Sequence, residues 1–129
     1  MHATDPYSIL PHRYPFAMLD RIIECEPGVR AAALRRVTEN DPFRLQVLYV
    51  EAMAQLAGVA VGGEEGEGGF LAAVEHAESF GAMEPGETLT ISVTLLKSFG
   101  RLHLFRGEVT GHSGLLAEAT FTIGIGPLK

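Results

Sequence analysis

One carboxylate stands alone in the most apolar stretch of the chain. Residues 47–61 read VLYVEAMAQLAGVAV, and Glu51 is their only charged side chain. Gln55 follows four residues later, so in a helix both polar side chains would lie on one face. A carboxyl group in an apolar pocket has a raised pKa and can hold a proton near neutral pH. The pattern makes Glu51 a candidate for acid–base chemistry.

A structural role for Glu51 is an open alternative. The residue falls in the first turn or so of the expected helix, where the helix dipole stabilises an acidic side chain. A glutamate near a helix end can also turn toward bulk solvent. In either case the carboxylate would have no chemical task.

Residues 47–61 predict the helix that carries Glu51. They are rich in Ala, Leu and Met, contain no Pro, and are apolar nearly all round, which indicates a buried helix. Small residues such as Ala57 and Gly58 would let a sheet approach closely. Gly58 costs helix stability, so we expect it to serve packing.

The rest of the chain predicts antiparallel strands. Residues 19–37 indicate a hairpin with a Glu-Pro-Gly turn at 26–28, and residues 70–80 indicate a further strand. TLTISVTL (88–95) alternates strictly between apolar and polar residues, which is typical of a half-buried strand. Two more strands are expected, at 101–110 and 115–125. In the last one Leu115, Ala117, Ala119, Phe121, Ile123 and Ile125 would share one face.

The glycine-rich segment GGEEGEGG (62–69) predicts a mobile surface loop between the helix and the next strand. The whole pattern is therefore a hairpin, one buried helix and four more strands. Short flanks cannot hide a single apolar helix, so the antiparallel sheet must curl around it. We expect an α+β fold in which the curled sheet encloses the helix.

Length and composition restrict the class of protein. The 129 residues suit one domain, 1–129, and 47% hydrophobic with 20% charged residues indicates a globular chain. Cys25 is the only cysteine, which excludes an intramolecular disulfide and a zinc site built from several cysteines. No residue spacing suggests a metal or an organic cofactor, so we expect none.

The charge pattern restricts the partners. The net charge is −6, and residues 45–96 hold eight acidic side chains and no basic one. Without a basic stripe we expect no nucleic-acid partner. The apolar stretch is short and contains Glu51 and Gln55, so we expect no membrane span. The N-terminus lacks a basic region before an apolar run, and we therefore expect a cytoplasmic protein.

Four segments, in order, resemble the hot-dog fold and within it the 3-hydroxyacyl-acyl-carrier-protein dehydratases of the FabA/FabZ group. ILPHRYPFAMLDRI (9–22) is similar to the group's opening signature, and RRVTENDPF (35–43) to its approach to the active site. EAMAQLAG (51–58) is similar to its helix motif, and MEPGETLTISVTLLKS (83–98) to its Pro-Gly turn and long fourth strand. The resemblance implies a curled antiparallel sheet around one central helix, a homodimer, and a thioester substrate on acyl carrier protein or coenzyme A.

The sequence departs from this group at the catalytic loop. The dehydratases carry a G-H-F-P-G…P-G loop before the helix, and its histidine is the catalytic base. Here Pro42-Phe43 is followed only by Arg44, Leu45 and Gln46 before the expected helix. No histidine lies between His12 and His76, so the group's histidine has no counterpart in this chain.

The resemblance implies a site shared between two subunits. A base of one subunit removes the proton next to the thioester carbonyl, and a carboxyl of the other protonates the departing hydroxyl. That carboxyl corresponds to Glu51, with Gln55 beside it. His76, in the strand after the helix, is a candidate replacement for the base, although alternation does not decide which way it points. An exposed strand histidine is the alternative.

Other residues are candidates for binding. Tyr49, Phe43 and His12 are candidates to line the substrate site, although packing is an equally open role for Tyr49, and His12 belongs to a signature that looks structural. A carrier protein is acidic, so basic residues on the two flanks are candidates to dock it. These residues are Arg13, Arg44 and Lys97.

Three functions remain open. The first is a dehydratase with a rearranged site, in which Glu51 is the acid. The second is a non-catalytic or accessory subunit that binds an acyl chain or carrier protein, or forms a heterodimer with a His-bearing dehydratase. The third is an acyl-thioesterase in which an ionised Glu51 activates water as a base.

Overall fold

The computed structural model describes residues 19–39, 46–62, 67–81 and 83–127. In this part of the chain the elements follow the predicted order of a hairpin, a helix and four strands. They are β1 (Arg21–Glu26), β2 (Arg30–Arg36), α1 (Gln46–Val61), β3 (Glu67–Ser79), β4 (Thr88–Phe99), β5 (Leu102–Gly111) and β6 (Gly114–Pro127).

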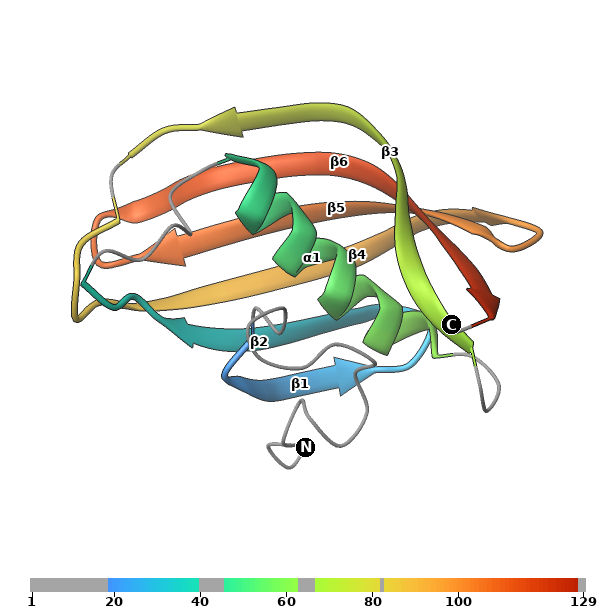
Figure 1. Ribbon diagram of the computed structural model, residues 1–129, viewed down its shortest axis with the longest axis horizontal. Coiled ribbons are helices and arrows are strands. Elements are labelled where there is room, and N and C mark those ends of the chain that lie inside the picture. The colour runs from blue at the N-terminus through green and yellow to red at the C-terminus, as the bar shows by residue number, and fades with distance from the viewer. Residues whose placement is uncertain (1–18, 40–45, 63–66, 82, 128–129) are drawn as a thin grey trace.

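The strands form one antiparallel sheet in the order β1-β2-β4-β5-β6-β3. The sheet curls around α1, and β3 crosses to the near side of the helix (Figure 1). β1 and β3 form its two edges. This is the architecture predicted from the sequence, and it follows from the need to bury a helix that is apolar nearly all round.

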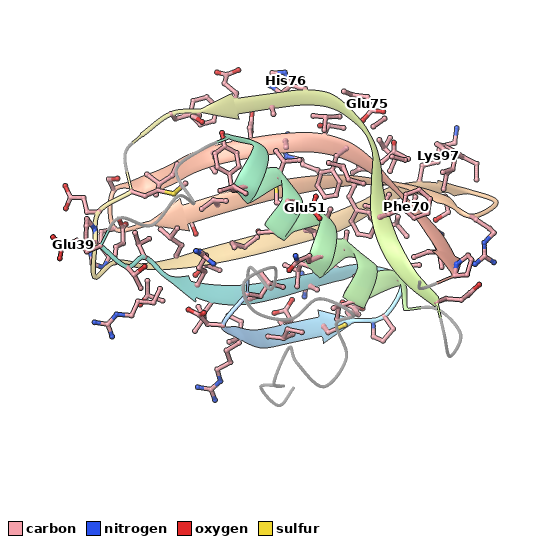
Figure 2. All side chains as sticks on the ribbon, in the orientation of Figure 1. Glu39, Glu51, Phe70, Glu75, His76 and Lys97 are labelled. Atoms are coloured by element: carbon pink, nitrogen blue, oxygen red, sulfur yellow. The ribbon has the colours of Figure 1, made fainter. Side chains whose placement is uncertain are left out.

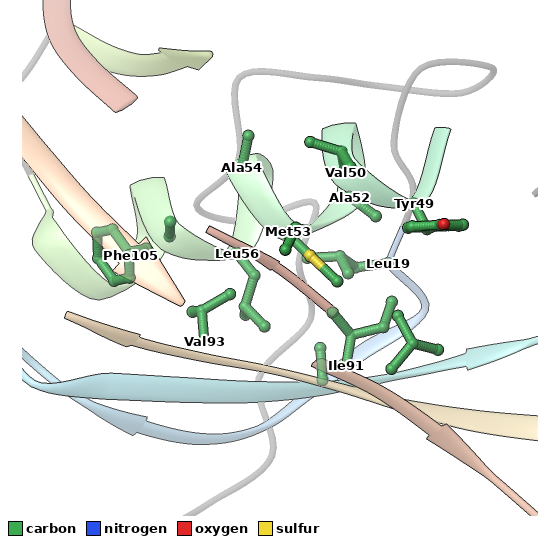
Figure 3. Close-up of a cluster of buried hydrophobic side chains, with 14 of the residues drawn as sticks. Leu19, Tyr49, Val50, Ala52, Met53, Ala54, Leu56, Ile91, Val93 and Phe105 are labelled. Carbon is green, nitrogen blue, oxygen red and sulfur yellow. The ribbon is translucent and has the colours of Figure 1, made fainter. Parts of the chain in front are cut away.

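The core lies between α1 and the concave face of the sheet. Met53 and Leu56 of the helix are fully buried and point toward Ile91 and Val93 of β4 (Figure 3). A Cβ atom added at Gly107 of β5 would lie 2.6 Å from the Met53 Sδ atom, so the glycine makes room for this side chain. Close packing of this kind leaves little freedom for α1 to shift against the sheet.

Two glycines bring α1 close to β3. A Cβ atom added at Gly69 would lie 3.1 Å from the Gly58 Cα atom, and one added at Gly58 would lie 3.5 Å from the Gly69 Cα atom. Gly58 therefore packs against the sheet, which confirms the role predicted for it.

The structure corrects two expectations. Residues 67–69 are not loop but the start of β3, where Gly68 pairs with Gly126 and Gly69 with Ile125. Gly69, which has no side chain, permits the close contact with Gly58 of α1, and residues 63–66 of the predicted loop lie outside the described residues.

The second correction concerns the last strand. The register between β5 and β6 shifts next to Thr110, which pairs with Leu115 while Val109 pairs with Ala117. Leu115 is therefore exposed and Leu116 is buried in its place. A bulge inserts one residue and so reverses the alternation before it.

Candidate active site

Glu51 lies in the second turn of α1, and the first turn carries no acidic residue. Its side chain is half-buried. Among the residues that the structure describes, none forms a hydrogen bond or ion pair with its carboxylate. Stabilisation by the helix N-terminus falls off after the first turn, so this structural explanation for Glu51 is weakened.

Glu51 belongs to the least covered side of the helix. Leu48, Glu51, Gly58 and Val59 are half-buried and share one side of α1, whereas most of the other helix residues are buried. Gln55 lies on the same side, one turn after Glu51, and is 4% exposed. Because Gly58 packs on Gly69, this side of α1 runs toward β3. The arrangement brings Glu51 and Gln55 together, as their spacing predicts.

Tyr49 fixes the beginning of α1 to the end of β3. Its side chain is fully buried, and its hydroxyl forms a hydrogen bond with the Ser79 hydroxyl. The ring thus contributes to the core near Glu51, and its role in substrate binding stays a prediction.

His76 lies on β3 with an exposed side chain. Its Nε2 atom is 3.4 Å from the Glu78 Oε1 atom. Figure 2 shows the imidazole pointing outward from the strand, away from α1 and Glu51. The two candidate catalytic groups are therefore not brought together within one chain. Any reaction that uses both would need a second chain.

The remaining predicted residues are only partly covered by the structure. Lys97 is exposed on β4, with its Nζ atom 5.7 Å from the centroid of the Phe99 ring. The other candidates for binding and docking lie outside the described residues: His12, Arg13, Phe43 and Arg44. Because α1 begins at Gln46, only two residues separate Phe43 from the helix.

A second histidine has a perturbed environment. The His103 Nδ1 atom lies 2.8 Å from the Ser98 hydroxyl oxygen, across the β4–β5 pair. Partial burial lowers the pKa of His103, and the nearby positive charge of Arg101 lowers it further. This favours a neutral imidazole.

Sequence reasoning missed Glu87, the one buried acidic side chain among the described residues. Its carboxylate accepts hydrogen bonds from the backbone N–H groups of Glu84 and His112. The preceding Pro-Gly turn was visible in the sequence, but the hairpin that covers Glu87 comes from 25 residues later. Its bonds are all to the backbone, which indicates a structural role.

Within the part of the chain that the structure covers, no three His, Cys, Asp or Glu side chains are grouped closely enough to hold a metal ion. None of the described helices is both long enough and apolar enough to cross a membrane.

Comparison with known proteins places this geometry in context. The model of the ApeP-like family, described as ApeP dehydratase, matches residues 4–125. The chain is 34% identical over 129 aligned residues to a 3-hydroxyacyl-[acyl-carrier-protein] dehydratase FabZ of Syntrophotalea carbinolica, covering 89% of this chain and 88% of the relative. It is 40% identical over 108 residues to the FabZ of Caldanaerobacter subterraneus, covering 74% and 77%.

A solved structure shares the fold. The dehydratase heterocomplex ApeI:P from Xenorhabdus doucetiae matches with a TM-score of 0.71 at 20% identity, over 98% of this chain and 93% of the matched one. The likeness confirms the predicted hot-dog architecture of a curled antiparallel sheet around one helix.

Proposed function

The chain belongs to the ApeP-like dehydratase family, and from this premise we propose that it acts in removing water from a 3-hydroxyacyl thioester carried on acyl carrier protein. The FabZ relatives named above support the reaction class. The observation that carries the proposal is the position of Glu51, the half-buried carboxylate on the least covered side of α1. We place the protein in the cytoplasm.

The reaction needs two groups. A base takes the proton from the carbon next to the thioester carbonyl, and the electron pair left behind forms the new double bond. Glu51 gives its proton to the hydroxyl group, which leaves as water, and the thioester bond stays intact. In this proposal Gln55, one helical turn after Glu51, holds the acid or the hydroxyl by hydrogen bonding.

The base comes from a second subunit in this proposal. The imidazole of His76 points away from Glu51 in its own chain, so it can meet Glu51 only across an interface. One form of the assembly is a homodimer in which His76 of one copy serves Glu51 of the other. The chain would then be a complete dehydratase with a rearranged site.

The second form is a heterodimer with a His-bearing dehydratase. Its motivating observation is the short connection before α1, which leaves no place for the catalytic loop. The structural likeness to the ApeI:P heterocomplex supports it as well. In this form the chain contributes Glu51 to a shared site and lacks a base of its own.

The test measures dehydration of a 3-hydroxyacyl carrier-protein thioester by the native chain, alone and mixed with a His-bearing FabZ whose own helix carboxylate has been replaced. Glu51→Gln removes the proton donor, so we expect turnover to fall by roughly 100-fold or more. Glu39→Gln is the matched control, because Glu39 is exposed and lies far from α1 in Figure 2.

Each form predicts its own result. Turnover by the chain alone that is lost in His76→Gln supports the homodimer, and turnover only in the mixture supports the heterodimer. Native turnover that survives Glu51→Gln removes Glu51 from the mechanism. Release of free thiol in place of the 2-enoyl product indicates an acyl-thioesterase.

A further inference from the structure

The outer edge of β3 has no partner strand among the described residues. β3 is 13 residues long and pairs only with β6, which leaves the backbone groups of its other side without a neighbouring strand. Phe70, Val74 and Phe80, on and just after this strand, are exposed. A long free edge with exposed apolar side chains is suited to pair with a strand of a second chain.

This edge strand carries charge of one sign. β3 contains Glu67, Glu75 and Glu78, and no lysine or arginine. Glu67 is neutralised by an ion pair with Arg101. Glu75 and Glu78 are both exposed, so their negative charges would face an approaching strand.

The neighbouring strands do not compensate these two charges. Glu75 accepts a hydrogen bond from the neutral Thr122 hydroxyl at 3.2 Å. Glu78 lies directly opposite Glu118 of β6, which lies opposite Glu108 of β5. Arg106 contacts the carboxylates of Glu118 and Glu108. Among the described residues, the ion-pair contact of Glu78 is with the imidazole of His76.

Pairing of two identical copies through this edge is therefore opposed by charge. In an antiparallel pair with two-fold symmetry every contact occurs twice. Suppose that the two-fold axis of the pair lies at any position between residues 74 and 79. Glu75 or Glu78 of one copy then lies directly opposite a glutamate of the other copy, or no more than two residues away from that opposite position. Like charges opposite one another destabilise a strand pair, and other registers retain the longer-range repulsion.

We propose that the β3 edge selects a different chain as its partner, one whose pairing strand carries lysine or arginine where this chain carries Glu75 and Glu78. The proposal rests on the shared site of the proposed function and adds the chemistry of the partner strand. The apolar side chains supply the attraction in any pairing, and the two carboxylates decide between a second copy and a basic strand.

Sedimentation of the full chain tests this at about 50 mM and about 500 mM salt, which screen charge to different extents. We expect self-association of the native chain to strengthen with salt. Glu75→Gln with Glu78→Gln should strengthen it roughly fivefold at low salt and abolish the salt dependence. The matched control is Glu39→Gln with Glu84→Gln, which removes two exposed charges outside β3 and should leave association unchanged.

The partner probe is a copy of this chain with Glu75→Lys and Glu78→Lys. Mixed with the native chain at low salt, it should form the mixed dimer in preference to either homodimer, and added salt should weaken that mixed dimer. If the native chain stays monomeric at all concentrations, its self-association cannot be compared, and formation of the mixed dimer is then sufficient support for the proposal.

Three results would overturn it: native self-association that is indifferent to salt, a double Gln variant that associates like the native chain, or one that forms only irregular aggregates. The last would show that the carboxylates merely prevent edge-to-edge aggregation. None of these variants alters Glu51, so failure here leaves the dehydration test standing, and failure of that test leaves this one standing.

Discussion

At the scale of the residue, Glu87 shows how one buried carboxylate joins three segments. Its oxygens accept the N–H groups of His112 at 2.6 Å and of Glu84 at 3.1 Å, and its backbone carbonyl accepts the N–H of Val37 at 2.8 Å. A side chain at Gly111 would occupy the space of the carboxylate. The hydrogen bond from the Glu84 N–H lowers the pKa of Glu87 most, and the bond from the His112 N–H lowers it further. Burial acts in the opposite direction but is outweighed.

The lowered pKa predicts how stability depends on pH. A group whose pKa is lower in the folded state stabilises that state above its unfolded value, here 4.5, and loses this contribution as pH falls through the folded value. Glu87→Gln should therefore lower the free energy of unfolding by about 1 kcal/mol at pH 7, with a smaller difference below pH 4. Chemical denaturation at several pH values measures this.

Glu84→Gln is the control, because Glu84 is exposed and offers only its backbone N–H to Glu87. We expect it to match the native chain across the pH range. An equal loss at pH 7 and pH 3 in Glu87→Gln would contradict the electrostatic explanation and leave only packing.

At the scale of the element, the contact of α1 with β3 holds the candidate site in place. Gly58 of α1 and Gly69 of β3 meet backbone to backbone, and Gly58 lies about two helical turns after Glu51. The hydrogen bond between Tyr49 and Ser79 fixes the other end of the same pair of elements. The orientation of Glu51 therefore depends on how closely this helix can approach this strand.

The two glycines are expected to respond differently to alanine. At Gly69 the new Cβ would lie 3.1 Å from backbone that cannot rotate away, so Gly69→Ala should lower the free energy of unfolding by about 1 kcal/mol. At Gly58 the distance is 3.5 Å, an ordinary contact, and alanine favours the helix by about 1 kcal/mol. Thermal unfolding of the two variants compares them directly.

Gly58→Ala thus serves as the matched partner of Gly69→Ala, because it adds the same methyl group to the other side of one contact. If Gly58→Ala and Gly69→Ala lower the free energy of unfolding equally, α1 and β3 pack more closely than the two distances indicate.

At the scale of the whole molecule, three features of the chain bear on the proposed shared site. Within the described residues, the Glu51 carboxylate has no hydrogen-bond or ion-pair partner, and the outer edge of β3 has no partner strand. The His76 side chain points outward. These three features have a common explanation if a second chain pairs along β3 and brings its own polar groups toward α1. The assembly, rather than the single chain, would then be the catalytic unit.

A shared site predicts that activity depends on dilution. The turnover per chain should fall in proportion to the dimer fraction and reach half its maximum at the concentration where half of the chains are paired. Initial rates and sedimentation, measured over the same concentrations, check this for whichever assembly proves active. Turnover per chain that stays constant while the dimer dissociates would show that a single chain holds the complete site.

The order of the elements could be read from the sequence because it depends on local patterns. The alternation in 88–95 and the unbroken apolar run in 47–61 each favour one type of element, whatever lies elsewhere in the chain. A lone carboxylate in an apolar run is also a local feature, so Glu51 could be singled out before its surroundings were known. The curl of the sheet followed from one helix that had to be buried.

Other features were decided only by the tertiary structure, because they depend on contacts between distant segments. The bulge that exposes Leu115 and buries Leu116 arises where β5 meets β6. The burial of Glu87 requires a hairpin far along the chain, and the direction of His76 is set by the pairing of β3 with β6. Local sequence patterns thus specify the elements and single out one acid, whereas the register between distant strands sets the direction in which each side chain points.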